Sequence, residues 1–229
     1  MRELWTCDLG TVEYRAAVEL QERLRARVVA GELPDLLLLL QHPPVYTLGR
    51  RSEPGDLPFG EEHWRAQGID VVQTQRGGKL TYHGPGQLVG YPIMHATDVI
   101  AFLRTMEGAI VAALAEEGIA ARGRDHEGPA YTGVWVEDRK IASIGVHLSK
   151  GVTAHGFAVN VNNDVAPFHQ VTACGLPGVQ MTSIALETGR TAGLDCFRRR
   201  VAHAYAQAHG ARQRIVAPAR LEAPIPSVA

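Results

Sequence analysis

The stretch that decides the fold runs from residue 76 to residue 91 and reads Arg-Gly-Gly-Lys-Leu-Thr-Tyr-His-Gly-Pro-Gly-Gln-Leu-Val-Gly-Tyr. It holds five glycines and a proline beside a histidine, two tyrosines and an arginine. Glycine permits positive φ and lets the main chain approach a ligand closely, so the pair after Arg76 and the Gly84-Pro85-Gly86 turn predict two tight bends holding a strand over a pocket. Taken alone, a Gly-Pro-Gly turn more often marks the tip of an ordinary hairpin, and that alternative stays open.

Several strands are predicted around this stretch. The apolar run 36–40 lacks alternation, which is typical of a strand covered on both faces. Residues 69–73 form a strand that delivers the chain to Arg76. Residues 133–136 and 141–146 read as a hairpin whose turn is 137–139, and 152–161 alternates as a further strand.

The helices are predicted from apolar spacing and from their end signals. Thr11 is expected to cap a helix that runs to about Val29, and Asp98 to cap one that runs to about Glu117. Shorter helices are expected at 61–67, 165–169 and 182–187, and a longer one at 195–209. From about residue 216 the proline-containing tail is expected to be frayed.

These elements do not follow the strict βαβ rhythm of a doubly wound sheet, and several strands are joined by short turns. We therefore predict an α/β fold of the α+β type, with a mixed, largely antiparallel sheet flanked by helices. The length of 229 residues fits one domain, and we expect residues 1–229 to form a single catalytic domain.

Composition excludes several classes of protein. A net charge of −1 and a pI near 6.8 give no basic footprint for nucleic acid. No signal peptide is apparent at the N-terminus, and the apolar run 36–40 is too short to span a membrane. Three cysteines at wide spacings argue against a disulfide framework and for a reducing, cytoplasmic compartment.

Two residues offer nucleophilic chemistry, although each has a commoner structural reading. Cys174 is the cysteine that lies in turn-type sequence, beside Gly175, so its thiol is a candidate nucleophile if a base or a cation stands nearby. Lys140 follows the predicted hairpin turn, where a lysine is normally a solvated surface charge. If it were partly buried instead, it could exchange a proton with a thiol.

Other chemistries find no support. The ten histidines and three cysteines show no His-Glu-x-x-His and no Cys-x-x-Cys spacing, so a metal site is not expected. Residues 84–90 match neither the dinucleotide fingerprint nor a P-loop, and no Gly-x-Ser-x-Gly elbow is present. We therefore expect no cofactor.

Residues 76–92 resemble the signature of the lipoyl(octanoyl) transferase family. The segments 41–49, 140–145 and 155–160 and the pair Cys174-Gly175 follow in the family's order. Two departures are visible, since Gln41 stands where the family often has Glu and Ala173 where Pro is common. Neither removes a catalytic group, although Ala173 makes the cysteine loop less rigid than Pro would.

The resemblance implies a catalytic domain like those of biotin and lipoate protein ligases, and an acyl-enzyme mechanism with Cys174 as nucleophile and Lys140 as the residue that takes its proton. The donor would be octanoyl-acyl carrier protein. The acceptor would be a lysine of a lipoyl domain, in 2-oxoacid dehydrogenase complexes or in the glycine cleavage H protein. The residues implied to bind the acyl group are Arg76, Gly77, Gly78, Lys79, Leu80, Thr81, Tyr82, His83, Ser143, Ile144, Gly145, Gly156, Phe157 and Ala158.

Physical chemistry supports these roles. A thioester donor carries an activated acyl group, so its transfer through a cysteine to an amine requires no ATP. Small residues such as Ala142, Gly145 and Gly156 would open an apolar slot, and backbone N–H groups near the cysteine loop and the Gly77-Gly78 pair could hold the oxyanion. Two alternatives remain: an ATP-dependent lipoate or biotin ligase of the same fold, and a non-catalytic module that grips acylated carriers. We also expect the Lys140 amine and the Cys174 sulfur to lie within hydrogen-bond reach.

Overall fold

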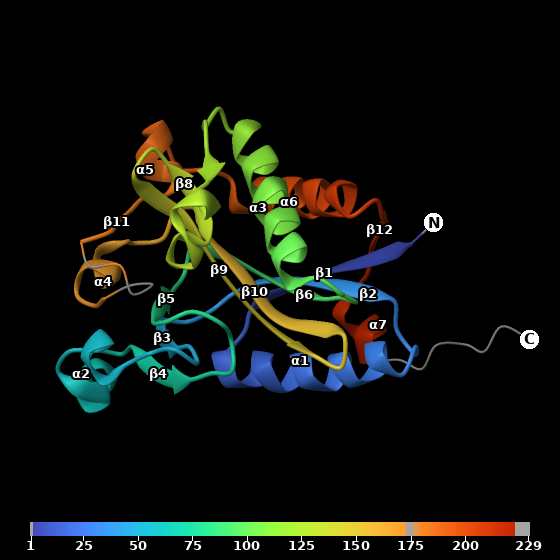
Figure 1. Cartoon of the computed structure of the whole chain (residues 1–229), viewed down its shortest axis with the longest axis horizontal. Helices are drawn as coiled ribbons and strands as arrows, with labels where there is room; N and C mark the ends of the chain where they lie inside the picture. The colour runs from blue at the N-terminus through green and yellow to red at the C-terminus, as the bar shows by residue number, and fades with distance from the viewer. Residues whose placement is uncertain (1, 173–175, 177, 223–229) are drawn as a thin grey trace, which may run out of the picture.

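The main sheet holds nine strands among the residues that the computed structural model describes, which are 2–172, 176 and 178–222. Eight of these strands follow one another across the sheet, and Figure 1 shows the sheet at the centre of the molecule. Their order is β12 (Arg212–Ile215), β1 (Glu3–Thr11), β2 (Asp35–Gln41), β6 (Gln87–Ile93), β10 (Val152–Asn160), β9 (Arg139–Ser149), β8 (Gly133–Val136) and β7 (Arg122–Gly123). The short strand β11 (Gln180–Met181) pairs with β9 outside this path.

The sheet is mixed and largely antiparallel, as predicted. β1 runs parallel to both of its neighbours, and β11 runs parallel to β9. The pairs from β2 through β6, β10, β9 and β8 to β7 are antiparallel. The long antiparallel pair β9–β10 runs through the middle of the molecule (Figure 1). It forms the floor of the candidate site described below.

A second, smaller sheet has the order β4 (Asp70–Gln73), β3 (Val45–Leu48) and β5 (Thr81–His83). The hairpin alternative for the Gly-Pro-Gly turn is wrong, because β5 pairs with β3 whereas β6 pairs with β2 and β10. The turn therefore carries the chain from one sheet to the other. Gly86 has a φ of +86°, and a Cβ there would lie 2.8 Å from the backbone nitrogen of Asn163.

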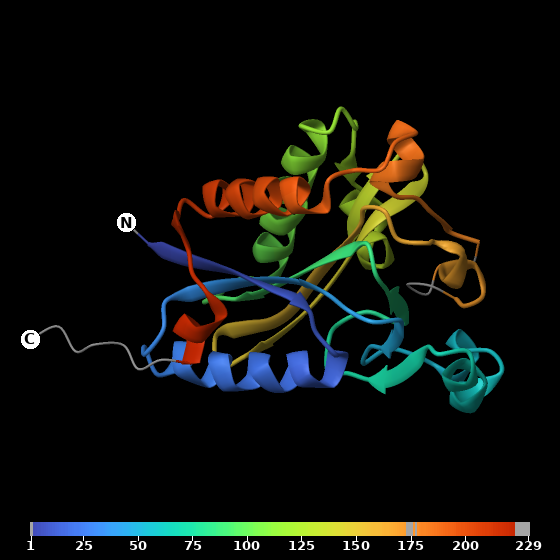
Figure 2. The same cartoon turned by 180° about the vertical axis from the view of Figure 1, so that it is seen from behind.

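Helices cover both faces of the main sheet. Helices α3 (Val99–Ala115) and α6 (Leu194–Ala208) lie on one face, and α1 (Tyr14–Val29) and α7 (Pro218–Glu222) on the other (Figures 1 and 2). Alternate residues of β2 join the two resulting cores, since Leu37 and Leu39 pack with α3 and α6 whereas Leu36, Leu38 and Leu40 pack with α1. This confirms that the apolar run 36–40 is a strand buried on both faces.

Shorter helices lie beside the small sheet and along the upper edge of the main one (Figure 1). They are α2 (Gly60–Ala66), α4 (Ala166–His169) and α5 (Ile184–Thr188), with 3-10 turns at Pro54–Asp56, Asp125–Glu127 and Pro129–Tyr131. Within the described part of the chain, no helix is both long and apolar enough to cross a membrane.

The helix ends show where local signals sufficed. Asp98 caps α3 by accepting hydrogen bonds from the N–H groups of Ile100 and Ala101, as predicted. The prediction that Thr11 caps α1 is wrong, because Thr11 is still part of β1 and the Glu13 carboxylate accepts from the Ala16 N–H instead. The tail prediction is wrong for 216–222, where α7 packs Leu221, 1% exposed, against the α1 core.

Candidate active site

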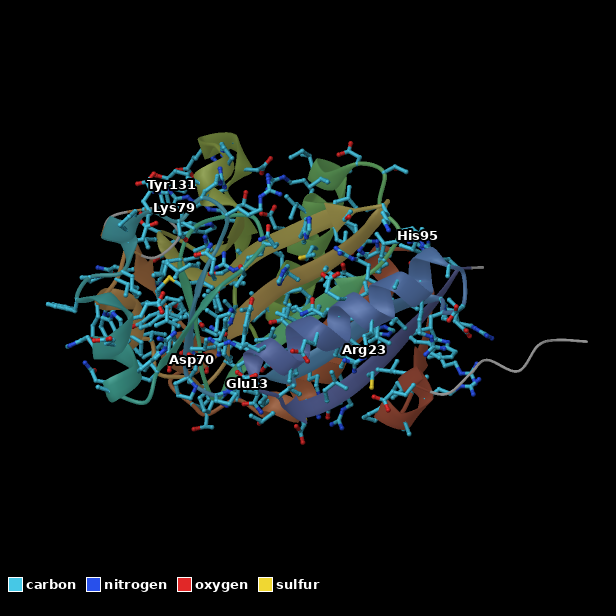
Figure 3. All side chains as sticks on the ribbon, turned by 90° about the horizontal axis from the view of Figure 1, so that it is seen from below. Glu13, Arg23, Asp70, Lys79, His95 and Tyr131 are labelled. Atoms are coloured by element: carbon cyan, nitrogen blue, oxygen red, sulfur yellow. The ribbon has the colours of Figure 1, made fainter. Side chains whose placement is uncertain are left out.

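A cavity of about 420 Å³ lies between the β9–β10 pair, the loop that precedes β5, and the first turns of α3. The lining residues of β10 are buried and those of β9 from Ser143 onward are half-buried, whereas Arg51, Ile100 and Pro129 on the rim are exposed. Figure 3 labels Lys79, which lines the cavity from the glycine loop, and Tyr131, in the 3-10 turn between the lining residues Ala130 and Thr132. The glycine-rich stretch therefore forms one wall of a pocket.

The structure brings nearly all the residues singled out from the sequence to this one cavity. Those that line it are Arg76, Gly77, Gly78, Lys79, Leu80, Thr81, His83, Lys140, Ser143, Ile144, Gly145, Gly156, Phe157 and Ala158. Tyr82 lies elsewhere, because side chains alternate along β5 and its ring packs against Tyr46 and Phe168 at centroid distances of 5.4 and 5.6 Å.

The apolar part of the lining that comes from α3 was not predicted from the sequence. Val99, Ile100 and Leu103 project into the cavity from the first turns of α3. The helix itself was predicted, but periodicity does not say which face of a helix will meet a ligand pocket. Together with Leu80, Ile144 and Phe157, these side chains provide the apolar surface that an acyl chain requires.

Glycines allow the loop and the strands to meet at backbone distance. A Cβ on Gly145 would lie 2.6 Å from the carbonyl oxygen of Gly77, and the Gly77 N–H donates to the Val146 carbonyl at 3.0 Å. A Cβ on Gly156 would lie 2.2 Å from the carbonyl oxygen of Gly90. A side chain at position 145 would push the loop off β9, one at position 156 would push β10 away from β6, and either would change the shape of the cavity.

Lys140 is buried, with 1% of its surface exposed, so the solvated-charge reading of this lysine is wrong. Its Nζ lies 5.2 Å from the ring centroid of Trp135, within the range of a cation–π contact. β11 covers the strand at this point, since Met181 pairs with Lys140 and the Thr182 N–H donates to the Lys140 carbonyl at 3.0 Å. The turn sequence at 137–139 indicated that Lys140 begins a strand, but it did not indicate that β11 would pack beside that strand.

Cys174 lies outside the described residues, so its predicted reach to Lys140 stays a prediction. The chain on both sides of it is held beside the cavity. Before it, the Thr172 N–H donates to the carbonyl of Asp56 at 3.1 Å, and Asp56 lies 3.7 Å from the amine of the lining residue Lys79. After it, Met181 and Thr182 run beside Lys140.

The two described cysteines are placed away from the cavity. Cys7 is 1% exposed in β1, and burial raises the pKa of its thiol to about 11, which opposes thiolate formation. Cys196 lies in α6, with its sulfur 3.4 Å from a guanidinium nitrogen of Arg199. Neither residue lines the cavity.

A cluster of buried polar rings forms the part of the lining nearest α1, and His83 is the member of it that was predicted to bind the acyl group. Tyr14, His83, Tyr91 and His155 line the cavity, and His42 lies behind them with its Nε2 2.7 Å from the Tyr91 hydroxyl. Burial lowers the pKa of His42 to about 4 and that of His155 to about 3, with the positive charge of Arg76 adding to the effect at His155. These histidines are therefore neutral at pH 7.

Arg76 brings a positive charge to this part of the lining and donates hydrogen bonds to neutral groups. Its Nη2 donates to the Thr47 hydroxyl at 2.8 Å, and its Nη1 donates to the Gly77 carbonyl at 3.1 Å. These bonds fix the guanidinium under the glycine loop. Of the ring cluster, His42, His83, Tyr91 and His155 lie in segments that resemble the family, whereas Tyr14 had no signal in the sequence.

Residues 13–206 match the family model described as the lipoyl protein ligase A/B catalytic domain. The chain belongs to this family. It is 44% identical over 199 residues to an octanoyltransferase of Geobacter metallireducens, across 85% of this chain and 88% of that protein. The family resemblance stated for residues 76–92 is thereby confirmed.

Solved structures of a lipoate-protein ligase and of a biotin protein ligase share the fold. A lipoate-protein ligase A bound with ATP superposes with a TM-score of 0.76 at 16% identity, covering 97% of this chain and 91% of that one. A biotin protein ligase from Aquifex aeolicus gives a TM-score of 0.52 at 13% identity, covering 91% and 69%. The predicted likeness to biotin and lipoate ligase domains is confirmed at the level of the fold.

Proposed function

We propose that this chain is an octanoyltransferase of lipoate biosynthesis that works through a cysteine thioester. The observation that carries the proposal is the buried amine of Lys140 at an apolar cavity, beside the chain segments that flank Cys174. The 44% identity to a protein named octanoyltransferase supports the same conclusion. The donor is octanoyl-acyl carrier protein, and the acceptor is a lysine of a lipoyl domain, either in a 2-oxoacid dehydrogenase complex or in the glycine cleavage H protein.

The first half-reaction forms an acyl-enzyme. Lys140 takes the proton of the Cys174 thiol, and the thiolate attacks the carbonyl carbon of the octanoyl thioester. When the tetrahedral intermediate collapses, the carbon–sulfur bond to the carrier breaks, and the departing carrier thiolate receives the proton from Lys140. The octanoyl group is then bound to Cys174 as a thioester.

The second half-reaction transfers the acyl group to an amine. Lys140, neutral again, accepts a proton from the acceptor lysine as its nitrogen attacks the thioester carbonyl. The amide bond forms, the bond to Cys174 sulfur breaks, and the thiolate is restored to a thiol by the proton on Lys140. Because an amide replaces a thioester, the sequence is downhill without ATP.

The oxyanion of each tetrahedral intermediate needs hydrogen-bond donors. The Gly77 N–H is not available, because it already donates to Val146. The Gly78 N–H donates to no residue in the described ranges, which leaves it as the candidate donor from this loop. Backbone donors of this kind act at fixed positions and contribute strongly to acyl transfer.

The acyl chain itself would lie along the floor of the cavity. Space for the chain is left by three small residues of the floor, Ser143, Gly145 and Gly156. Apolar surface is provided by Phe157 and by Val99 and Leu103 of α3. Lys79 stands on the rim, where it is paired with Glu53 at 3.1 Å. We further propose that residues 1–229 act as one catalytic domain, because the family model covers most of their length.

The test is the mass of the intact protein after incubation with octanoyl-acyl carrier protein in the absence of an acceptor. The wild type should gain one octanoyl group, and Cys174→Ala should gain none. Cys7→Ala, which removes a buried thiol, is the control that should still be acylated. Normal octanoyl transfer to a lipoyl domain by Cys174→Ala would overturn the mechanism.

Incubation of the wild type and Cys174→Ala with a lipoyl domain, with and without ATP, separates the two alternatives. An ATP-dependent ligase would modify the acceptor only with ATP present and would survive the loss of Cys174. A non-catalytic binder would retain the carrier without any covalent gain of mass.

A further inference from the structure

Glu107 is a buried carboxylate on α3, with 4% of its surface exposed, and no step of the mechanism uses it. A carboxylate is costly to bury unless its charge and its lone pairs are matched by donors. One oxygen accepts a hydrogen bond from the Gly133 N–H at 2.8 Å, and the other is bonded to Arg104, which lines the cavity. Gly123 also approaches it closely, since a Cβ there would lie 3.1 Å from that second oxygen.

Gly133, the residue that Glu107 holds, touches the side chain of Lys140. A Cβ on Gly133 would lie 2.7 Å from Cε and 3.4 Å from Nζ of Lys140, so the end of the lysine runs along the bare Cα of this glycine. Gly133 is also the first residue of β8 and follows the 3-10 turn Pro129–Tyr131. The hydrogen bond to Glu107 therefore holds the backbone at the point where β8 begins.

The other contact of the Lys140 amine depends on the same strand. Trp135, whose ring centroid is 5.2 Å from Nζ, lies two residues after Gly133 in β8. Gly133 pairs with Ser143 of β9, and the register shifts between Val134 and Trp135, so the ladder from Gly133 to the Trp135–Lys140 pair is interrupted. Glu107 supplies an anchor from the helix layer.

We propose that Glu107 is a positioning residue for Lys140: by holding the Gly133 backbone it fixes where the lysine amine stands in the cavity. This inference rests on the proposed acyltransferase function. Proton exchange between an amine and a thiol depends steeply on their separation, and a displacement of about 1 Å can cost about a hundredfold in rate. Glu107 acts through Gly133 and touches neither substrate nor the reacting atoms.

Three variants separate the hydrogen bond from the charge. Glu107→Gln keeps an oxygen that can accept from Gly133 and removes the charge opposite Arg104, so acyl-enzyme formation should stay within about threefold of wild type. Glu107→Ala removes both, and Glu107→Asp keeps the charge but withdraws the oxygen from Gly133. Both should slow acyl-enzyme formation roughly 10- to 100-fold with little change in KM for octanoyl-acyl carrier protein.

A second readout does not depend on octanoyl transfer. The rate of alkylation of Cys174 by iodoacetamide as a function of pH, followed by intact mass in a Cys7→Ala and Cys196→Ala background, reports how Lys140 promotes the thiolate. Glu107→Ala and Glu107→Asp should move this profile toward that of Lys140→Ala, whereas Glu107→Gln should keep it in place. The control is Glu117→Ala, which removes a carboxylate whose side chain is 10% exposed and bonded to Arg200 instead.

The outcomes are distinct. If Glu107→Ala and Glu107→Asp acylate as fast as Glu117→Ala, or if Glu107→Gln is as slow as Glu107→Ala, the proposed route through Gly133 is wrong. Should Glu107→Ala fail to fold, Glu107→Asp carries the test. Failure of the wild type to form an octanoyl adduct on Cys174 would instead refute the function, and the alkylation profiles would still decide the role of Glu107.

Discussion

Gly133 has a backbone φ of +136°, a region in which side chains are strained, and its Cα lies against Lys140. An alanine Cβ would also lie 2.4 Å from the carbonyl oxygen of Ala142, a backbone atom that cannot turn away. Gly133→Ala should therefore displace β8 from β9 and move the lysine amine. We expect acyl-enzyme formation to fall at least about tenfold, measured by intact mass against time.

Gly133→Ala will also lose stability from backbone strain alone, by about 1–3 kcal/mol for a side chain at such a φ. This loss of stability has to be separated from the effect on the acylation rate. Gly151→Ala is the matched control, because Gly151 also has a positive φ, +74°, and a Cβ there meets no atom within 4 Å. It should lose stability and keep its acylation rate. Equal acylation rates in the two variants at a temperature where both are folded would contradict the prediction.

Single residues also show what the sequence could and could not predict about the site. The family resemblance predicted that Arg76, Gly77 and Ser143 lie at one pocket, whereas the residues alone indicated a pocket wall only for the glycine-rich stretch 76–91. Neither predicted the burial of Lys140, which depends on β11 arriving from forty residues further along the chain. Burial of a charge is a property of the assembled fold, and no local pattern encodes it.

At the scale of elements, Asn160 at the end of β10 joins three segments. Its Nδ2 donates to the Thr182 carbonyl at 2.9 Å, and its Oδ1 accepts from Gln87 at 3.0 Å and from Asn163 at 3.1 Å. Thr182 in turn is bonded to the Lys140 backbone and follows the segment that contains Cys174. Asn160 thus ties β6 and β10 to the chain that returns from the cysteine.

Asn160→Ala should lower the free energy of unfolding by about 1–3 kcal/mol, because it leaves buried partners unpaired. It should also slow acyl-enzyme formation about tenfold by loosening the segment next to Cys174. Asn162→Ala is the comparison, since Asn162 makes two hydrogen bonds to Ala192 at 2.7 and 2.9 Å, away from Lys140. Urea unfolding and timed acylation measure the two effects, and an acylation rate equal to that of Asn162→Ala would refute the link.

Elements differed in how well they could be predicted. β2 and α3 were found because apolar runs and an Asp cap are local signals. β12 was missed because Arg212-Gln213-Arg214 reads as polar surface, and it is an edge strand that pairs with β1. The split of residues 81–93 between two sheets was also hidden, since the partner of β5 is β3, more than thirty residues earlier.

At the scale of the whole molecule, the buried neutral histidines couple stability to pH. Burial holds the pKa of His42 at about 4 and that of His155 at about 3, and it lowers the pKa of the buried His83 as well. An unfolded chain binds these protons near pH 6.5. Between about pH 6.5 and the folded-state values, the unfolded state therefore carries more protons than the folded state, and stability falls as the pH is lowered.

Each such histidine contributes about 1.4 kcal/mol per pH unit inside this window, so His42 and His155 should each cost about 2 kcal/mol between pH 6.5 and pH 5. Urea unfolding from pH 8 to pH 5 measures the slope. His155→Asn is the most direct variant, because His155 has a φ of +57° and asparagine tolerates that conformation. It should reduce the slope below pH 6.5 by about one proton, whereas His203→Asn, which removes an exposed histidine of α6, should leave the slope in place. A His155→Asn slope that matches the wild type would mean that His155 takes up its proton without unfolding, and the ring cluster would then tolerate a positive charge beside Arg76 that its burial argues against.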